Sequence, residues 1–306
     1  GYVVGFRHLH ITGGEPLLWE GLFETLDYSF EIGYRTVFIN TNGTRLRPGV
    51  ARKIATYRHC SVSVSLDGNA SLHNRFRGEG TYPKVISGIE AALNAGVELV
   101  VFTVARKSLM PFLPHFAEDV YRQFPDIAGL TLIQLFSLTD NGFALQEEFL
   151  QPHDFISLVR TVSLLNLYGR TVIIKNNPLS NVVSKLMEVP WIPMTHPLYR
   201  LGSIFIMADR NISVSHSSRN SLGKYTPGAI ARVMSSKKYQ AQIAPDEHTC
   251  PDCRFEGVCR ENGMLRPSEY YRDKNPDMPY CQRVMQEVTA KTTMTGSAGS
   301  GIMIDR

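Results

Sequence analysis

The sequence Ile11-Thr12-Gly13-Gly14-Glu15-Pro16-Leu17-Leu18 lies almost at the beginning of the chain. Before it, Leu9 and Ile11 alternate with polar neighbours, which predicts a short strand. The two glycines leave backbone N–H and C=O groups uncovered where this strand ends, so a ligand can approach the main chain there. Glu15 adds a carboxylate, and Pro16 ends the strand. Free carbonyls and a carboxylate suit a cationic amine, but a tight turn with a solvated glutamate explains this motif equally well.

A repeated alternation of strand and helix patterns follows the motif. Strand patterns occur at 36–40, 61–66, 98–104, 129–136 and 171–175, with helical patterns between them at 49–57, 82–94, 112–124 and 153–168. Such alternation predicts parallel strands with right-handed crossovers, in an α/β barrel or a doubly wound sheet. We expect an α/β fold, a partial (β/α) barrel of about six parallel strands, with its site where the strands end.

The pattern changes after the last of these strands. A proline- and asparagine-rich stretch follows, then a hairpin pattern around residues 208–210, and the chain ends in a Thr/Gly/Ser/Ala-rich segment. We expect the barrel over 1–176, a linker over 177–200, a small cysteine-rich domain over 201–288 and a flexible tail over 289–306.

Four of the five cysteines lie in the expected C-terminal domain, at Cys250, Cys253, Cys259 and Cys281. The first three form a C-x2-C-x5-C pattern, and the fourth follows after 21 residues. Thiolates with this spacing can bind one metal centre, either an iron–sulfur cluster or a structural zinc ion. A disulfide framework would need an oxidising compartment and usually a smaller scaffold. The remaining Cys60 fits a buried position at a strand end.

Composition argues against two classes of partner. The net charge is only +4, and no run of Lys or Arg indicates a nucleic-acid surface. No stretch approaches the roughly 20 apolar residues of a membrane span. We therefore expect neither nucleic acid nor a membrane as partner.

The motifs together resemble the radical S-adenosylmethionine (SAM) enzymes, and specifically the SPASM subgroup, which modifies peptides and proteins. The resemblance rests on the Gly-Gly-Glu-Pro turn, on Ser65-Leu66-Asp67-Gly68 with the downstream His73-Asn74-Arg75-Phe76-Arg77-Gly78, and on the cysteine-rich end. It implies that Gly13, Gly14, Glu15 and Pro16 bind the amino group of SAM. It implies that Ser65 and Arg77 hold the SAM carboxylate, which an arginine fork fits well, with Arg75 as the rival. Asn40 and Asn42 would meet the ribose.

The same resemblance implies a role for the cysteines as cluster ligands. This sequence departs from the pattern of the family in two places. Cys250, Cys253, Cys259 and Cys281 resemble the ligands of an outer auxiliary [4Fe–4S] cluster, whereas the inner cluster set is missing, so one auxiliary cluster is expected. The C-x3-C-x2-C loop that holds the SAM-cleaving [4Fe–4S] cluster is also missing. We expect that this loop belongs to a truncated N-terminal segment, that the cluster occurs only in the full-length protein, and that this chain alone is inactive.

The resemblance implies a peptide maturase, in which a 5′-deoxyadenosyl radical abstracts hydrogen from a peptide or protein substrate. A reductant such as flavodoxin or ferredoxin would supply the electron, and the cytoplasm would supply the reducing conditions that clusters and thiolates need. The alternatives are a sulfatase-type maturase, a small-molecule enzyme, a cofactor-dead peptide-binding module and a structural zinc protein. No catalytic residue is identified, since Arg106, Gln134, Asp209 and His216 all fit structural roles better.

Overall fold

The computed structural model describes most of the chain. The described residues are 1–135, 145–175, 177–189, 192–193, 203–214, 220–243, 253–255, 258 and 280–296. Among them, no helix combines the length and the apolar character needed to cross a bilayer.

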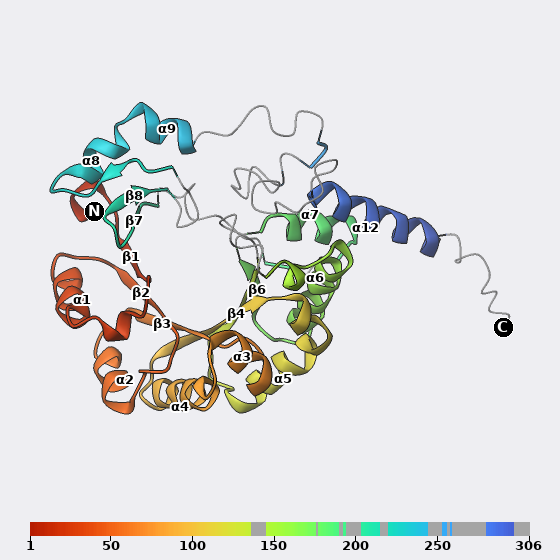
Figure 1. Ribbon diagram of the computed structural model, residues 1–306, viewed down its shortest axis with the longest axis horizontal. Helices are drawn as coiled ribbons and strands as arrows, with labels where there is room; N and C mark the ends of the chain where they lie inside the picture. The colour runs from red at the N-terminus through yellow and green to blue at the C-terminus, as the bar shows by residue number, and fades with distance from the viewer. Residues whose placement is uncertain are drawn as a thin grey trace, which may run out of the picture.

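Six parallel strands form one sheet in the order β1-β2-β3-β4-β5-β6, which is also their order along the chain. Figure 1 shows this sheet curving through the molecule with helices along its outer side. The predicted α/β fold with a six-stranded partial barrel is therefore confirmed. The strands are β1 His8–Ile11, β2 Thr36–Thr41, β3 Cys60–Ser65, β4 Glu98–Ala105, β5 Gly129–Gln134 and β6 Val172–Lys175.

Helices connect the strands, as the alternation predicts, and short 3₁₀ helices accompany them. In this part of the chain they are η1 Tyr2–Val4, η2 Pro16–Leu18, α1 Leu22–Glu31, α2 Pro48–Ala55, α3 Ala70–Arg77, α4 Thr81–Asn94, η3 Lys107–Phe112, α5 Leu113–Gln123 and α6 Pro152–Leu167.

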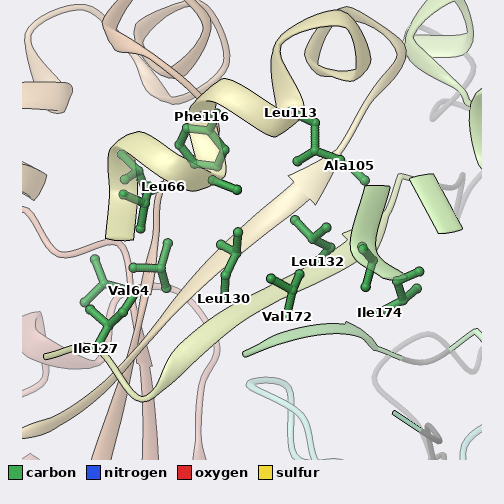
Figure 2. Packing of buried hydrophobic residues seen from close by; sticks show 14 of the residues in the cluster. Val64, Leu66, Ala105, Leu113, Phe116, Ile127, Leu130, Leu132, Val172 and Ile174 are labelled. Atoms are coloured by element: carbon green, nitrogen blue, oxygen red, sulfur yellow. The ribbon is translucent and has the colours of Figure 1, made fainter. Parts of the chain in front are cut away.

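Alternating burial along each strand separates the two faces of the sheet. In β4, Leu99, Val101 and Thr103 are fully buried, whereas the residues between them are only half-buried. Figure 2 shows the buried residues of β5 and β6 packing beside Leu113 and Phe116 of α5. Successive side chains of a strand point to opposite faces. The half-buried set therefore lines the concave face, which the helices leave uncovered.

A small antiparallel sheet forms a second unit with its own core. The hairpin pattern predicted around residues 208–210 is present as β7 Phe205–Ile206 and β8 Asn211–Ser213, with β9 Gly223–Lys224 beside them. The helices α8 Ala229–Met234 and α9 Lys237–Ile243 follow. Ile212, Val233 and Tyr239 are buried in a cluster separate from the main core.

Two helices differ from the boundaries expected from the sequence. The expected linker 177–200 contains α7 Leu179–Leu186, whose buried Val182 and Val183 belong to the main core. The helix α12 Tyr280–Gly296 runs across the expected boundary at 288 and packs on α6 and α7. The prolines obscured α7 because Pro178 only precedes its first turn, where proline is tolerated.

Candidate functional site

Glu15 is held at the carboxyl ends of β1 and β2 by uncharged donors. Its Oε1 accepts hydrogen bonds from Leu17 N at 3.1 Å and Thr41 Oγ1 at 2.5 Å, and its Oε2 accepts from Asn42 N at 2.7 Å. Among the described residues, no cation forms an ion pair with this carboxylate. This strand end therefore carries one negative charge that is oriented but not neutralised.

The two glycines before Glu15 leave open space. Gly13 has φ of +125°, a left-handed conformation that only glycine adopts readily. Gly14 has no such requirement, and a Cβ placed on either residue would meet no described atom within 4 Å. Neither backbone conformation nor packing within the described chain explains the glycine at position 14. A ligand lying against the backbone would explain it.

The two asparagines predicted to contact a ribose differ in how many of their polar atoms are free to bind a ligand. Asn40 lies on the concave face, where its Oδ1 accepts from Ser63 Oγ at 2.7 Å and its Nδ2 lies 3.5 Å from Thr12 Oγ1. Asn42 instead stabilises its own turn, since its Oδ1 accepts from both the backbone N–H and the hydroxyl of Thr44. Only the amide nitrogen of Asn42 remains available to a ligand.

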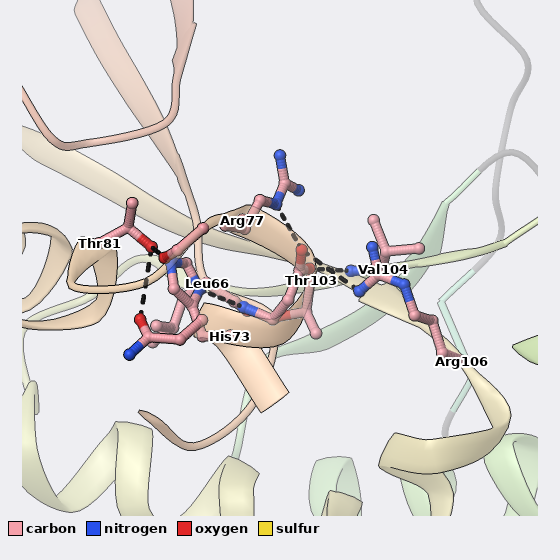
Figure 3. A network of polar contacts seen from close by, with 10 residues as sticks. Leu66, His73, Arg77, Thr81, Thr103, Val104 and Arg106 are labelled. Atoms are coloured by element: carbon pink, nitrogen blue, oxygen red, sulfur yellow. Dashed lines mark hydrogen bonds and ion pairs between the residues drawn. The ribbon is translucent and has the colours of Figure 1, made fainter. Parts of the chain in front are cut away.

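A second charged cluster lies beyond the carboxyl ends of β3 and β4 (Figure 3). Asp67, whose side chain is fully buried, receives Arg77 Nε at 2.6 Å and Arg106 Nη1 at 3.3 Å on one oxygen. Its other oxygen accepts the backbone N–H of Val104 at 2.8 Å. The guanidinium of Arg106 also lies 4.2 Å from the centroid of the Phe76 ring. One carboxylate is thus shared by two guanidiniums.

The protonation states in this cluster follow from its geometry. Burial alone would raise the pKa of Asp67, but Arg77, Arg106 and the N–H of Val104 bring the pKa below its ordinary value. Burial lowers the pKa of the Arg106 guanidinium, which still remains charged. The cluster carries one net positive charge. Arg77 contacts Asp67 through Nε, and Figure 3 shows the terminal nitrogens of Arg77 pointing away from that hydrogen bond, so this charge is available to a ligand.

His73, on the same helix α3 as Arg77, fixes the turn that carries Asp67. Its Nδ1 accepts the backbone N–H of Asp67 at 3.1 Å, which places the proton of the neutral ring on Nε2. Burial lowers the pKa of His73 and favours this neutral form.

The rival arginine is already neutralised. Arg75 pairs with Glu148 at 3.2 Å, and Glu148 also accepts the backbone N–H of Ser108. Arg77 is therefore better placed than Arg75 to bind an anion. Ser65, the last residue of β3, has no hydrogen-bond partner within the described part of the chain, so its hydroxyl is available beside the cluster.

The weaker catalytic candidates have structural partners. Gln134 donates to Tyr280 Oη at 3.2 Å and accepts from Asn177 Nδ2 at 2.8 Å. Asp209 is exposed and bonds Asn211 in its own turn. His216 lies outside the described residues.

The cysteine site is only partly described. Cys253 and Cys281 both pack against the main core, whereas Cys250 and Cys259 lie outside the described residues. In the described ranges, no three potential metal ligands come together. The four-thiolate site therefore remains a prediction. Cys60 is buried, as expected, and burial raises the pKa of its thiol to about 12.

Sequence reasoning missed Asp67 and Lys175. Asp67 appeared only as part of a motif, although a carboxylate between a strand and two following arginines was a signal for a charged cluster. Lys175 ended an unremarkable strand pattern, and only the curvature of the sheet shows that it lies on the concave face.

Comparison with known proteins assigns a class to this arrangement. Residues 2–112 match the family model described as the radical SAM superfamily. This segment, which is similar to radical SAM domains, contains both charged strand ends and the first four strands of the sheet.

Two curated relatives and one solved structure extend the comparison. The AdoMet-dependent heme synthase of Methanosarcina barkeri (strain Fusaro / DSM 804) is 30% identical over 157 residues, covering 50% of this chain and 42% of that protein. Mycofactocin maturase MftC of Mycolicibacterium smegmatis is 34% identical over 106 residues, covering 34% and 25%. The chain spans less than half the length of either relative. Native anSMEcpe with bound AdoMet and Kp18Cys peptide has a TM-score of 0.65 at 17% identity, covering 96% of this chain and 86% of that one, which shows a shared fold.

Proposed function

We propose that this chain is the cofactor- and substrate-holding part of a radical SAM enzyme of the SPASM type that modifies a peptide or protein. The observation that carries the proposal is the opposite charge of two strand ends in one sheet. Glu15 contributes an unneutralised negative charge, and the cluster of Asp67, Arg77 and Arg106 contributes a net positive charge. An amino-acid moiety presents the complementary pair, an ammonium and a carboxylate.

In this proposal, Glu15 and the open backbone at Gly13 and Gly14 bind the ammonium of SAM, and Pro16 fixes the turn. Arg77 and Ser65 bind the carboxylate, while Asn40 and the amide nitrogen of Asn42 contact the ribose. Asp67 holds the Nε side of Arg77, so the guanidinium meets its ligand with little loss of conformational freedom.

A reduced [4Fe–4S] cluster would supply the electron that cleaves bound SAM into methionine and a 5′-deoxyadenosyl radical. No C-x3-C-x2-C motif occurs in these 306 residues, so its thiolates would come from elsewhere in a longer protein, and this chain alone would not cleave SAM. Cys250, Cys253, Cys259 and Cys281 would hold one auxiliary cluster. We place the protein in the cytoplasm, with a flavodoxin or ferredoxin as reductant, because such clusters need reducing conditions.

The peptide substrate is supported by the comparisons. The solved structure with a TM-score of 0.65 contains a bound peptide, and one curated relative is a maturase. A small-molecule substrate is the second candidate, because the longer of the two curated matches is to a heme synthase.

Equilibrium dialysis of radiolabelled SAM against this chain tests the proposed site. Glu15→Gln and Arg77→Met each remove one charge-assisted contact, which contributes about 1.5–3 kcal/mol, so the Kd should rise roughly 10- to 150-fold. Glu20→Gln and Arg52→Met are the matched controls, since both residues are exposed and lie outside the site.

The two variants should also differ in ligand preference. A SAM analogue without its carboxylate should bind wild type and Arg77→Met almost equally, while still distinguishing wild type from Glu15→Gln. Unchanged SAM binding by both variants would overturn the assignment.

A second measurement, iron and zinc content after anaerobic reconstitution, separates the auxiliary cluster from a structural zinc site, which would be colourless.

A further inference from the structure

Lys175 occupies an unusual position on the concave face of the sheet. It is the last residue of β6 and pairs in register with Ile133 of β5. Its Nζ lies 5.5 Å from the ring centroid of Phe102 and 5.9 Å from that of Phe38. The amine therefore reaches from one side of the curved sheet toward the other.

These three side chains come from alternate strands, β2, β4 and β6. Side chains from alternate strands form the interior layers of a (β/α) barrel. Phe38 and Phe102 are only half-buried, as is Lys175, so this layer is not sealed by the protein. The ammonium therefore faces the interior of the half-barrel between two aromatic faces.

The charge of Lys175 has no counter-ion in the described part of the chain. None of the ion pairs found there includes this residue. The carboxylates of Glu148 and Asp67 pair with arginines instead. Burial is the sole cause that lowers the pKa of Lys175, without an opposing carboxylate. Two aromatic faces attract a cation but leave its charge uncompensated. Partial burial of such a charge is unfavourable unless a ligand pairs with it.

We propose that Lys175 anchors a carboxylate of the substrate inside the half-barrel. This inference rests on the proposed function, in which the substrate enters this interior, and it specifies the substrate as acidic. A carboxylate would neutralise the ammonium, and Phe38 and Phe102 would contact the apolar part of the same group. The carboxylate comes either from a chain terminus or from an acidic side chain. In the proposed function SAM occupies a different site, because Arg77 beyond β3 binds its carboxylate.

Competitive acetylation with acetic anhydride, read by mass spectrometry of peptides, tests this anchor in the intact chain. The exposed Lys84 and Lys107 are internal references. N-acetylphenylalanine presents a terminal carboxylate, N-acetylglutamate methylamide presents a side-chain carboxylate, and N-acetylphenylalaninamide is the neutral control. We expect one or both acids to slow acetylation of Lys175 about fivefold relative to the references, with no effect of the amide. The acid that protects at the lower concentration identifies the source.

Two variants separate a charge effect from a structural one. Lys175→Met keeps a long apolar side chain and should raise the Kd of the protective acid, measured by calorimetry, roughly tenfold or more, whereas Lys175→Arg should change it less than about threefold. Equal protection by acid and amide, protection by neither, or unchanged acid binding in Lys175→Met would overturn the inference.

The outcome is independent of SAM binding and cleavage. The labelling series is run with and without SAM, and Lys175→Met should bind SAM with the wild-type Kd. Loss of SAM binding in Glu15→Gln with no acid protection at Lys175 would leave the proposed function standing and refute only the acidic substrate.

Discussion

The strand ends of β1–β2 and of β3–β4 hold a carboxylate in two different ways. Glu15 receives only uncharged donors, from Thr41 and from backbone N–H groups, and keeps its charge. Asp67 is shared by two guanidiniums, and their second positive charge is left over. Fixing an anion with neutral dipoles leaves it able to bind a cation, whereas fixing it with excess cations creates an anion site. Two acidic residues thus produce sites of opposite sign.

Replacing each carboxylate by alanine should give the largest difference in the free energy of unfolding between the two strand ends. Asp67→Ala leaves buried Arg106 without its partner and should lower the free energy of unfolding by about 3 kcal/mol, after allowing for Arg77, which is one-third exposed and can turn to water. Glu15→Ala removes hydrogen bonds from uncharged donors at a half-buried site, leaves no unpaired charge behind and should cost about 1–2 kcal/mol. Urea denaturation measures both, and equal losses would contradict the comparison.

Arg106→Met removes the second cation without touching the proposed ligand. Asp67 then pairs with Arg77 alone and the net positive charge disappears. We expect the Kd for SAM to rise about threefold to tenfold, while the Kd of a carboxylate-free SAM analogue stays unchanged. An equal loss for both ligands would indicate general disruption of the cluster.

Acidification should weaken the β3–β4 end in two steps. The folded-state pKa of His73 lies below the ordinary 6.5, so the unfolded chain binds the proton first and stability falls as pH drops below about 6.5. The folded-state pKa of Asp67 lies below 3.8, so its contribution is present above that pH and is lost as pH falls through the folded-state pKa.

Chemical denaturation across pH 3–8 resolves these two steps when wild type is compared with His73→Gln and Asp67→Asn. The upper step should disappear in the first variant and the lower step in the second. A wild-type profile retained in both variants would assign the acid sensitivity to other groups.

Gly14→Ala is the smallest expected perturbation of the fold. Its Cβ meets no described atom and its φ is ordinary, so the free energy of unfolding should change by less than about 0.5 kcal/mol. The Kd for SAM should nevertheless rise about fivefold, because the methyl occupies the space proposed for the ligand. Gly13→Ala, which strains a positive φ, is the comparison variant and should lose about 1 kcal/mol. Unchanged SAM affinity in Gly14→Ala would argue against ligand contact there.

The sequence predicted the sheet well because strand and helix periods are local properties. Motifs also singled out the residues from Gly13 to Pro16, and Arg77, as candidates for the site, and their roles stay predictions. It could not predict that Arg106 would share the carboxylate of Asp67, because that contact depends on how β3 and β4 lie side by side. The helices α7 and α12 were missed for other reasons: Pro178 directly precedes the first turn of α7, and the expected boundary at 288 divided α12.

The hydrogen bond between Gln134 and Tyr280 joins positions 146 residues apart. A ribosome adding about 5–20 residues per second would need roughly 7–30 s to make the second partner after the first. During that interval the apolar side of α6 and α7 that α12 later covers is exposed on the nascent chain. Because α12 is synthesised last, we expect the nascent chain to depend on chaperones. We also expect low yields of variants that end before α12.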